Sequence, residues 1–371
     1  MKRGYKVQFV TVVSIVVLAI IQSCNMKAEH SEETLFVGTY TDSGSEGIYR
    51  FSFNPLTGEL QYRALAAALK NPSFIAMSED RKNMYAVGEV DDFEGTSGSI
   101  TTFKLTDTIL EKLDTQSTHG ANPCHVSVSK TGDYVGVANY TGGNVAVFKR
   151  SDTGRLEANP QVIDHKVSDS SSTSHAHMAK FIDGELFVAD LGLDRIKKYN
   201  EKNNRFGASE QPELVVAEGA GPRHFVTSKD ARFVYVINEL NSTITLFEKQ
   251  NERYAGLQTY TTLAVDFKGE SYCADIRLSS DGKFLYGSNR GENTIVIFKV
   301  DAANGHLELV GRESVRGDWP RNFTLDPSGG FLLVANQRSN NIVVFKRDTQ
   351  TGVLGFVGEM ALQSPVCLDF L

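Results

Sequence analysis

Three of the eight histidines of the chain stand at similar places in short strand-like segments. His125, His177 and His224 each lie four residues before the residue that ends such a segment. The same place in the other four segments holds Phe74, Asp275, Asn322 and Val366. Because the unperturbed pKa of imidazole is close to neutrality, this pattern indicates a group of side chains capable of proton transfer.

Arginines accompany these histidines. Arg223 directly precedes His224, and Arg321 has the same place beside Asn322. A guanidinium group donates paired hydrogen bonds that match the oxygens of a carboxylate or phosphate. The sequence therefore predicts a site for an anionic ligand.

Polar residues also end a second kind of apolar segment. They are Glu89, Asn139, Asp190, Asn238, Glu239, Asn289, Arg290 and Asn336. Asparagine at a strand end often ties down neighbouring loops, and this structural interpretation applies to the four asparagines. His175-Ala176-His177 has a spacing that could hold a metal, but no carboxylate accompanies it. We therefore predict no metal and no cofactor.

The elements that must position these residues recur along the chain. Seven apolar segments match one another around Gly38, Gly88, Ala138, Ala189, Ile237, Gly287 and Ala335, which are 48 to 51 residues apart. Each is followed by two further strand-like segments and preceded by one, with turn residues between them. Four short strands repeated seven times, without a helical pattern, predict an all-β, seven-bladed β-propeller with four antiparallel strands per blade.

The two ends of the repeat predict how the ring closes. The first repeat begins at Leu35 with its second strand, and residues 364–370 form a lone strand of the innermost kind. That C-terminal strand is expected to complete the N-terminal blade, which leaves no open edge. Since the start of an inner strand and the end of a second strand lie at the same face of a blade, the polar residues should surround one mouth of the central channel.

Charge and cysteine content bear on the partners of the protein and on the state of its thiols. The formal net charge is −7, and no basic stripe is present, so nucleic acid is an unsuitable partner. Cys124, Cys273 and Cys367 are widely spaced in apolar segments and are expected to be buried free thiols.

The N-terminus has the layout of a secretory signal. Residues 1–6 are basic, residues 7–21 are mainly apolar, and Cys24 follows Ser23. We expect 1–24 to be a signal peptide with a lipobox-like end, lipidated at Cys24, followed by a linker (25–34) and the propeller (35–371). An ordinary signal peptide or an uncleaved anchor is the alternative. The prediction is an exported monomer, held by a lipid anchor in the periplasm or at the outer membrane or surface of a bacterium.

Several motifs resemble the lactonase family of seven-bladed β-propellers, which includes 6-phosphogluconolactonases of the cycloisomerase type and, more distantly, carboxy-cis,cis-muconate lactonizing enzymes. They are Asn122-Pro123-Cys124-His125-Val126, His175-Ala176-His177, Gly221-Pro222-Arg223-His224-Phe225, Asn238-Glu239-Leu240, Ser288-Asn289-Arg290-Gly291 and Pro320-Arg321-Asn322-Phe323. The resemblance implies catalytic roles for His177, Arg223, Glu239 and Arg290, with His175 as the substitute for His177. Together with the strand-end pattern it suggests His125, His175, Asp190, His224, Arg321 and Asn322 as substrate-binding residues.

The resemblance implies hydrolysis of a sugar lactone, with 6-phosphogluconolactone as the reference substrate. Export of the chain would separate it from cytoplasmic sugar phosphates, so another lactone is an equally suitable substrate. Two alternatives remain at this point: a muconate-type cycloisomerase reaction at the same site, and a propeller that binds a ligand or protein without catalysis.

Overall fold

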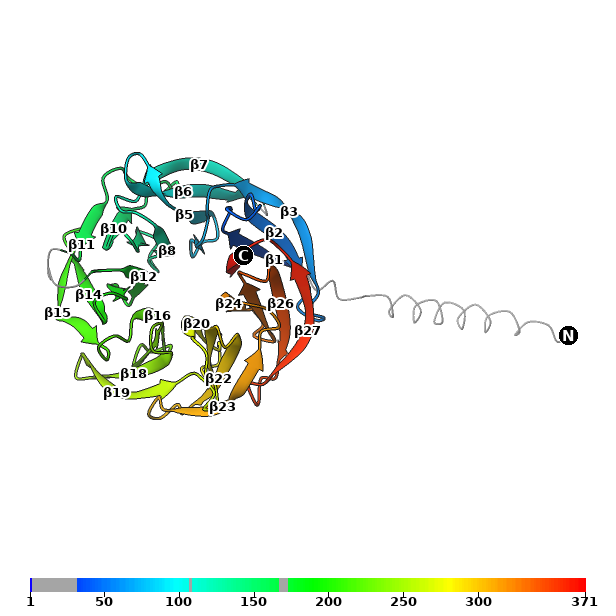
Figure 1. The fold of residues 1–371 in the computed structure, drawn as a ribbon. Coiled ribbons are helices and arrows are strands. Elements are labelled where there is room, and N and C mark those ends of the chain that lie inside the picture. Colours follow the sequence, from blue (N-terminus) through cyan, green and yellow to red (C-terminus); the bar gives the residue numbers. More distant parts are fainter. Residues whose placement is uncertain (2–31, 107–108, 167–172) are drawn as a thin grey trace. The chain divides into compact units, whose positions relative to one another are not determined.

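Seven small sheets stand around a central axis, each made of four antiparallel strands (Figure 1). The computed structural model describes residues 1, 32–106, 109–166 and 173–371. The chain separates into two compact units, Met1–Glu32 and Glu33–Leu371, and the second is the propeller. The all-β, seven-bladed prediction is confirmed. Residues 2–24 of the predicted signal peptide, Cys24 included, lie outside the described residues.

The inner strands line the axis, and four of the seven begin with proline, which lacks an N–H donor and is tolerated at the first position of a strand. They are β28 (Pro365–Phe370), β4 (Ile75–Met77), β8 (Pro123–Val128), β12 (Ala176–Ile182), β16 (Pro222–Thr227), β20 (Tyr272–Leu278) and β24 (Pro320–Leu325). The second strands are β1 (Glu33–Thr39), β5 (Asn83–Phe93), β9 (Tyr134–Asn139), β13 (Glu185–Asp190), β17 (Phe233–Asn238), β21 (Phe284–Arg290) and β25 (Phe331–Asn336).

The third and outer strands complete each blade. The third strands are β2 (Gly47–Phe53), β6 (Ser97–Thr106), β10 (Asn144–Lys149), β14 (Arg195–Lys202), β18 (Thr243–Gln250), β22 (Thr294–Val300) and β26 (Asn341–Arg347). The outer strands are β3 (Leu60–Ala68), β7 (Ile109–Ser117), β11 (Gln161–Asp164), β15 (Arg205–Val215), β19 (Arg253–Thr261), β23 (Leu307–Ser314) and β27 (Leu354–Ala361).

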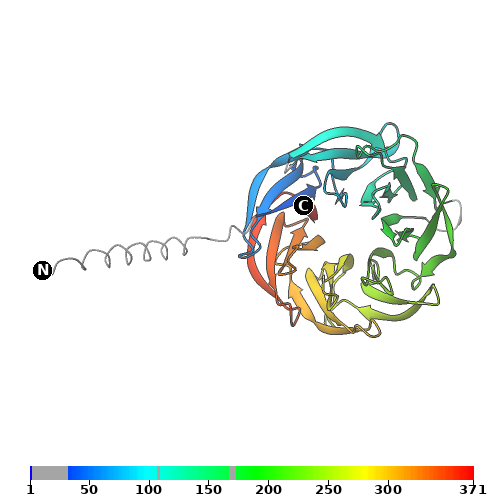
Figure 2. The ribbon, with the colours of Figure 1, turned by 180° about the vertical axis from the view of Figure 1, so that it is seen from behind.

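The two ends of the propeller meet in one blade, as predicted. β28 pairs with β1 in the register Leu35↔Phe370 and Val37↔Leu368. In both views the red C-terminal strand lies on the axial side of the blue strands (Figures 1 and 2). Closure therefore depends on hydrogen bonds between segments more than 320 residues apart in sequence, as the pairing of residue 37 with residue 368 requires.

Stability comes from apolar faces packed between neighbouring blades. In β13, Phe187 and Ala189 pack toward β17, where they meet Val234 and Val236, all at 0% exposure. The alternate β13 residues pack toward the preceding blade, because successive side chains of a strand point to opposite faces. Each fully buried side chain of this size contributes about 1.5–3 kcal/mol. Within the part of the chain that the structure describes, no helix is apolar and long enough to cross a bilayer.

Candidate active site

A β-bulge near the start of several inner strands leaves one residue of each strand unpaired. In β16, Pro222 pairs with Asn238 and His224 with Ile237, which leaves Arg223 as the extra residue. The same shift in β8, β12 and β24 leaves Cys124, His177 and Arg321. A bulge redirects the side chain of the unpaired residue, so these four residues form one ring of equivalent positions.

This register corrects the predicted alignment of the histidines. Met178, which pairs with Ala189, corresponds to His125 and His224, whereas His177 corresponds to Arg223. His125 and His224 therefore lie one layer further along the channel than His177. The reason is that the hairpin from β12 to β13 is two residues shorter than its counterparts, one on each side, which spacing from the strand end does not reveal.

A second ring of equivalent positions lies where the second strands end. Each member directly follows the position that Asn139, Asn238 and Asn289 occupy in their blades. Its members are Tyr40, Glu89, Tyr140, Leu191, Glu239, Arg290 and Gln337. All of them except Leu191 line one of two adjoining cavities. The residue before each member instead points into the blade, since successive strand residues face opposite sides.

The two cavities share Tyr40, Glu89, Arg290 and Arg321. We call the deeper one, of about 220 Å³, the arginine cavity; Cys124, Tyr140, His177 and Glu239 complete its lining. The outer one, of about 540 Å³, is the vestibule. It adds Asp42, Ser43, Asn71, Asn122, Trp319, Gln337, Arg338 and Ser364.

Glu239 is held between two arginines. Its Oε2 lies 2.9 Å from Arg223 Nε and 2.9 Å from Arg290 Nη2. Burial alone would raise the pKa of Glu239, but Arg290 and Arg223 outweigh it and lower this pKa below its ordinary value. Glu239 is consequently an anion at neutral pH. Burial lowers the pKa of Arg290 to about 10, which still leaves it charged.

The backbone of β20 fixes these arginines. Arg223 Nη1 donates to the carbonyl of Ala274 at 2.6 Å, and Arg290 Nη2 donates to that of Cys273 at 3.0 Å. Both carbonyls lie where the pairing of β20 with β21 is interrupted, between Cys273 and Ile276. The irregularity frees acceptors that a regular ladder would have used.

On the other side of the cavity, Tyr40 lies between Arg321 and Glu89. The Tyr40 hydroxyl donates to Glu89 Oε2 at 2.9 Å and accepts from Arg321 Nη2 at 2.7 Å. Burial raises the pKa of Tyr40 above its ordinary value, so the phenol stays protonated. Arg321 stays charged, because the pKa of its guanidinium group is raised despite burial, with the negative charge of Glu89 acting in that direction.

His177 is the neutral member of the site. Its side chain is 5% exposed, and its ring centroid lies 5.6 Å from that of Tyr140. Burial first, and then the charge of Arg223, lower the pKa of His177 well below 6.5. At neutral pH the imidazole is therefore uncharged and can accept a proton.

The charges around the cavity do not cancel. Three guanidinium groups (Arg223, Arg290 and Arg321) face two carboxylates (Glu239 and Glu89), which leaves one positive charge in excess. Such a site can bind an oxyanion or stabilise one that develops during a reaction. Among the described residues, no group of three or more His, Cys, Asp or Glu side chains is placed to hold a metal ion.

The structure brings four of the predicted residues to this cavity: His177, Glu239, Arg290 and Arg321. Arg223 lies behind Glu239 and is only 2% exposed, so the expectation that it lines the mouth of the channel is corrected. His175 stacks on Tyr140 with the ring centroids 4.4 Å apart and supports the wall of the cavity.

Four other predicted substrate-binding residues do not reach the arginine cavity or the vestibule. Asp190 is fully buried and accepts hydrogen bonds from Ser174 Oγ at 2.6 Å and from the backbone of Leu193 at 3.2 Å. Asn322 donates to Asp275 at 2.7 Å. Both tie elements together, as the asparagines of the same strand ends do. His125 and His224 line a separate chamber, described below.

Sequence reasoning missed Tyr40 and Tyr140. The signal was available, because both occupy the position of Glu239 and Arg290 in the repeat, where the second strand ends. Polar residues such as Asn139 and Asn238 mark the ends of the second strands more clearly, but in most blades these residues are structural. The cavity is lined by the residue that follows each of them. Trp319 lies in the vestibule beside Arg338, whose guanidinium carbon is 3.3 Å from the indole centroid.

Comparison with known proteins shows which family this chain resembles. The profile of the family described as "Lactonase, 7-bladed beta-propeller" matches residues 34–370. A 6-phosphogluconolactonase of Formosa agariphila is 38% identical over 309 residues, covering 79% of this chain and 86% of the relative. One of Bacillus subtilis is 32% identical over 302 residues, covering 79% and 85%. The periplasmic gluconolactonase PpgL of Pseudomonas aeruginosa superposes with a TM-score of 0.86 at 33% identity, over 92% of this chain and 99% of that one.

Proposed function

The chain belongs to the lactonase family of seven-bladed β-propellers, and on that premise we propose that it hydrolyses the ester bond of a sugar lactone in the arginine cavity. One observation carries this proposal. An uncharged imidazole, His177, and two guanidinium groups, Arg290 and Arg321, line the same small cavity. Lactone hydrolysis needs both, because water must lose a proton while negative charge develops on the carbonyl oxygen.

The first step is addition of water to the lactone carbonyl carbon. His177 takes a proton from the attacking water, and the carbonyl oxygen becomes an oxyanion. Arg290 and Arg321, which line the cavity from different blades, stabilise that charge. Both are fixed before the substrate arrives, by backbone carbonyls and by Tyr40 respectively, so little reorganisation is required.

The second step breaks the bond between the carbonyl carbon and the ring oxygen. The carbonyl re-forms, and the departing ring oxygen receives the proton that His177 holds. The product is an open-chain hydroxy acid, and His177 is neutral again. Glu239 faces the cavity as an anion and orients the water and the sugar hydroxyls. Arg223 touches only Glu239 and the protein around it, and is therefore a positioning residue.

The vestibule would receive the far end of the sugar. Arg338 stacks on Trp319 there, and Arg290 and Arg321 also reach it. These cations favour a phosphate or carboxylate on the substrate, as in the two relatives named as 6-phosphogluconolactonases. The relative from Pseudomonas aeruginosa is named as a gluconolactonase, so both the phosphorylated and the plain lactone belong in the assay.

The test is turnover of 6-phosphogluconolactone and of gluconolactone by purified protein, with the spontaneous rate subtracted. We expect acceleration of at least one lactone, and loss of it in His177→Gln. Turnover of a muconate without any lactone hydrolysis would assign the site to the cycloisomerase reaction instead. If neither lactone nor muconate reacts, the catalytic proposal fails, and a binding function remains.

We further propose that the protein is an exported monomeric lipoprotein anchored through Cys24. The basic, apolar and Ser-Cys order of residues 1–24 supports this, as does the periplasmic relative. Expression in a bacterial host with labelled palmitate should mark the wild type and leave Cys24→Ser unlabelled. Equal labelling of both, or recovery of the unprocessed wild type in the cytoplasm, would refute the anchor.

A further inference from the structure

The channel contains a second cavity that shares no residue with the arginine cavity. We call it the lysine chamber; it measures about 220 Å³. Its lining includes Lys180, Arg277 and Asp369, which lie further along the inner strands than the bulge residues. The chamber therefore lies on the other side of a layer formed by Phe74, His125 and His224, whose rings contact one another.

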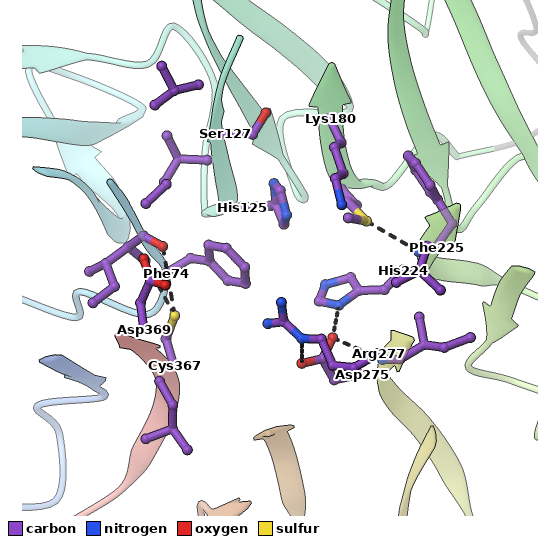
Figure 3. A pocket seen from close by; sticks show the side chains of 18 of the residues that line it. Phe74, His125, Ser127, Lys180, His224, Phe225, Asp275, Arg277, Cys367 and Asp369 are labelled. Atoms are coloured by element: carbon purple, nitrogen blue, oxygen red, sulfur yellow. Dashed lines mark hydrogen bonds and ion pairs between the residues drawn. The ribbon is translucent and has the colours of Figure 1, made fainter. Parts of the chain in front are cut away.

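The polar groups of this chamber point toward a common centre. Figure 3 shows Lys180, Arg277, His125 and His224 converging from four different blades on open space. The Arg277 side chain is 37% exposed, so solvent reaches the chamber. None of these residues takes part in the proposed lactonase reaction.

Donors of the two cations remain unpaired, although the carboxylates of Asp275 and Asp369 also line the chamber and balance their formal charge. Within the described part of the chain, Lys180 has neither a hydrogen bond nor an ion pair. Arg277 makes one contact, of 3.3 Å, with Asp275. Asp275 is already shared, since it accepts from His224 Nδ1 at 2.9 Å and from Asn322 Nδ2 at 2.7 Å. Most of the donors of Lys180 and Arg277 are therefore available to a ligand.

The wall of the chamber also contains a polar atom without a partner. His125 is 4% exposed, and its Nδ1 makes no hydrogen bond. A buried nitrogen in this state costs free energy, and a ligand that formed a hydrogen bond with it would remove that cost. The remaining walls are apolar, with Met178 and Phe225 among them, and they strengthen electrostatic contacts inside the chamber.

We propose that the lysine chamber binds a small oxyanion, a carboxylate or a phosphate, between the ammonium group of Lys180 and the guanidinium group of Arg277. The anion would relieve the repulsion between these two cations and would lie within reach of the imidazole of His125. Burial lowers the pKa of Lys180 to about 8, with Arg277 acting in the same direction, and an anion would reverse part of that shift. This site is independent of the lactonase reaction.

The experiment is isothermal titration calorimetry with orthophosphate in one arm and acetate in the other. The proteins are the wild type, Lys180→Gln, Arg277→Gln and the control Lys346→Gln, whose side chain is exposed on β26. We expect binding of at least one anion by the wild type and the control. Affinity should fall about tenfold to a hundredfold in each chamber variant, as for the loss of one charged hydrogen-bond donor. The arm that binds identifies phosphate or carboxylate as the ligand.

Two outcomes would overturn the proposal: no binding of either anion by the wild type at millimolar concentrations, or equal affinity in Lys180→Gln and the wild type. The second result would show that the anion does not bind through Lys180. Lys180→Gln should retain the circular dichroism spectrum and any lactone turnover of the wild type, which excludes misfolding as the cause of a loss. Since calorimetry does not require catalysis, an inactive protein that binds the anion would refute the lactonase proposal and leave this one standing.

Discussion

The carboxylate of Glu239 and the guanidinium of Arg223 form an ion pair of 2.9 Å in which only the carboxylate faces the cavity. The Glu239 side chain is 18% exposed, whereas that of Arg223 is 2% exposed. Both residues belong to one blade: Arg223 is the bulge residue of β16, and Glu239 directly follows β17. Arg223 therefore holds Glu239 in place from the side that faces away from the cavity.

The first prediction concerns this support. Arg223→Ala should lower kcat/KM by about tenfold to a thousandfold, the range found for groups that organise an oxyanion site. It should also lower stability, by up to about 3 kcal/mol, because a buried carboxylate loses one of its two partners. Steady-state kinetics and thermal unfolding would measure the two effects. Arg223→Lys should recover little, since one ammonium group cannot reach both Glu239 and the Ala274 carbonyl.

Arg232→Ala is the matched control for that experiment. Arg232 lies in the same blade and pairs with Glu248, but its side chain is 44% exposed. An exposed pair contributes about 0–1 kcal/mol, so activity and stability should both stay close to the wild type. If Arg223→Ala behaved like this control, Arg223 would have no positioning role.

The second prediction concerns the base. His177→Gln should lower kcat by about a hundredfold to ten-thousandfold with a small change in KM, because it removes proton transfer and leaves the arginines in place. His175→Gln is the control, since His175 stacks behind Tyr140 and does not line the cavity. The reverse result, a large loss in His175→Gln and a small one in His177→Gln, would assign the base role to His175.

The third prediction is the pH dependence of kcat/KM. The pKa values of His177 and of Glu239 are both lowered. Burial lowers the pKa of His177, whereas burial raises that of Glu239 and the neighbouring arginines outweigh it. Each group must be unprotonated to act, so activity is present above these values and is lost as the pH falls through them. The profile should therefore stay flat from pH 8 down to well below 6.5. An acid limb centred at or above pH 6.5 would contradict a base in this environment.

The fourth prediction separates a structural residue from a substrate-binding one. Asn322 is 1% exposed; it donates to Asp275 and accepts from the backbone of Leu368 at 2.8 Å. It thus connects the blade of β20 to the closing strand β28. Asn322→Ala should cost about 1–3 kcal/mol of stability, seen as a lower Tm, and leave KM unchanged. A raised KM with an unchanged Tm would show that Asn322 binds the substrate.

The blade architecture could be predicted because it depends on patterns that the sequence displays directly. Apolar residues such as Phe187 and Val188 alternate between two buried faces, and Pro222 and Pro320 mark the starts of inner strands. The same patterns predicted closure by residues 364–370.

The site could be predicted only in part, because a shift of one residue turns a side chain to the opposite face. A bulge at position 177 and a shorter hairpin after β12 placed His177 with Arg223 and not with His125. Asp190 and Glu239 looked equivalent as strand ends, yet one points into the blade and the other into the cavity. Backbone irregularities of this kind leave little trace in the spacing of residue types.

The last prediction concerns the stability cost of Lys180. Its folded pKa is lowered to about 8 from the ordinary value of 10.5, so between these values the unfolded chain binds more protons than the folded one. The contribution of Lys180 to stability must then rise with pH across this window, and below pH 8 the folded state carries the full cost of a charged Lys180. The groups that face it from the neighbouring strands are His125, His224, Asp275, Arg277 and Asp369.

Lys180→Met removes that charge and keeps the length of the side chain. It should raise Tm at pH 7 by a few degrees, on the order expected for about 1–2 kcal/mol in a domain of this size. The gain over the wild type should shrink as the pH rises from about 8 to about 10.5, because the wild-type lysine then becomes neutral in both states. Differential scanning fluorimetry across this range, with Lys346→Met as the exposed control, would measure it. A Tm below that of the wild type at pH 7, or a gain independent of pH, would show that Lys180 carries no such cost.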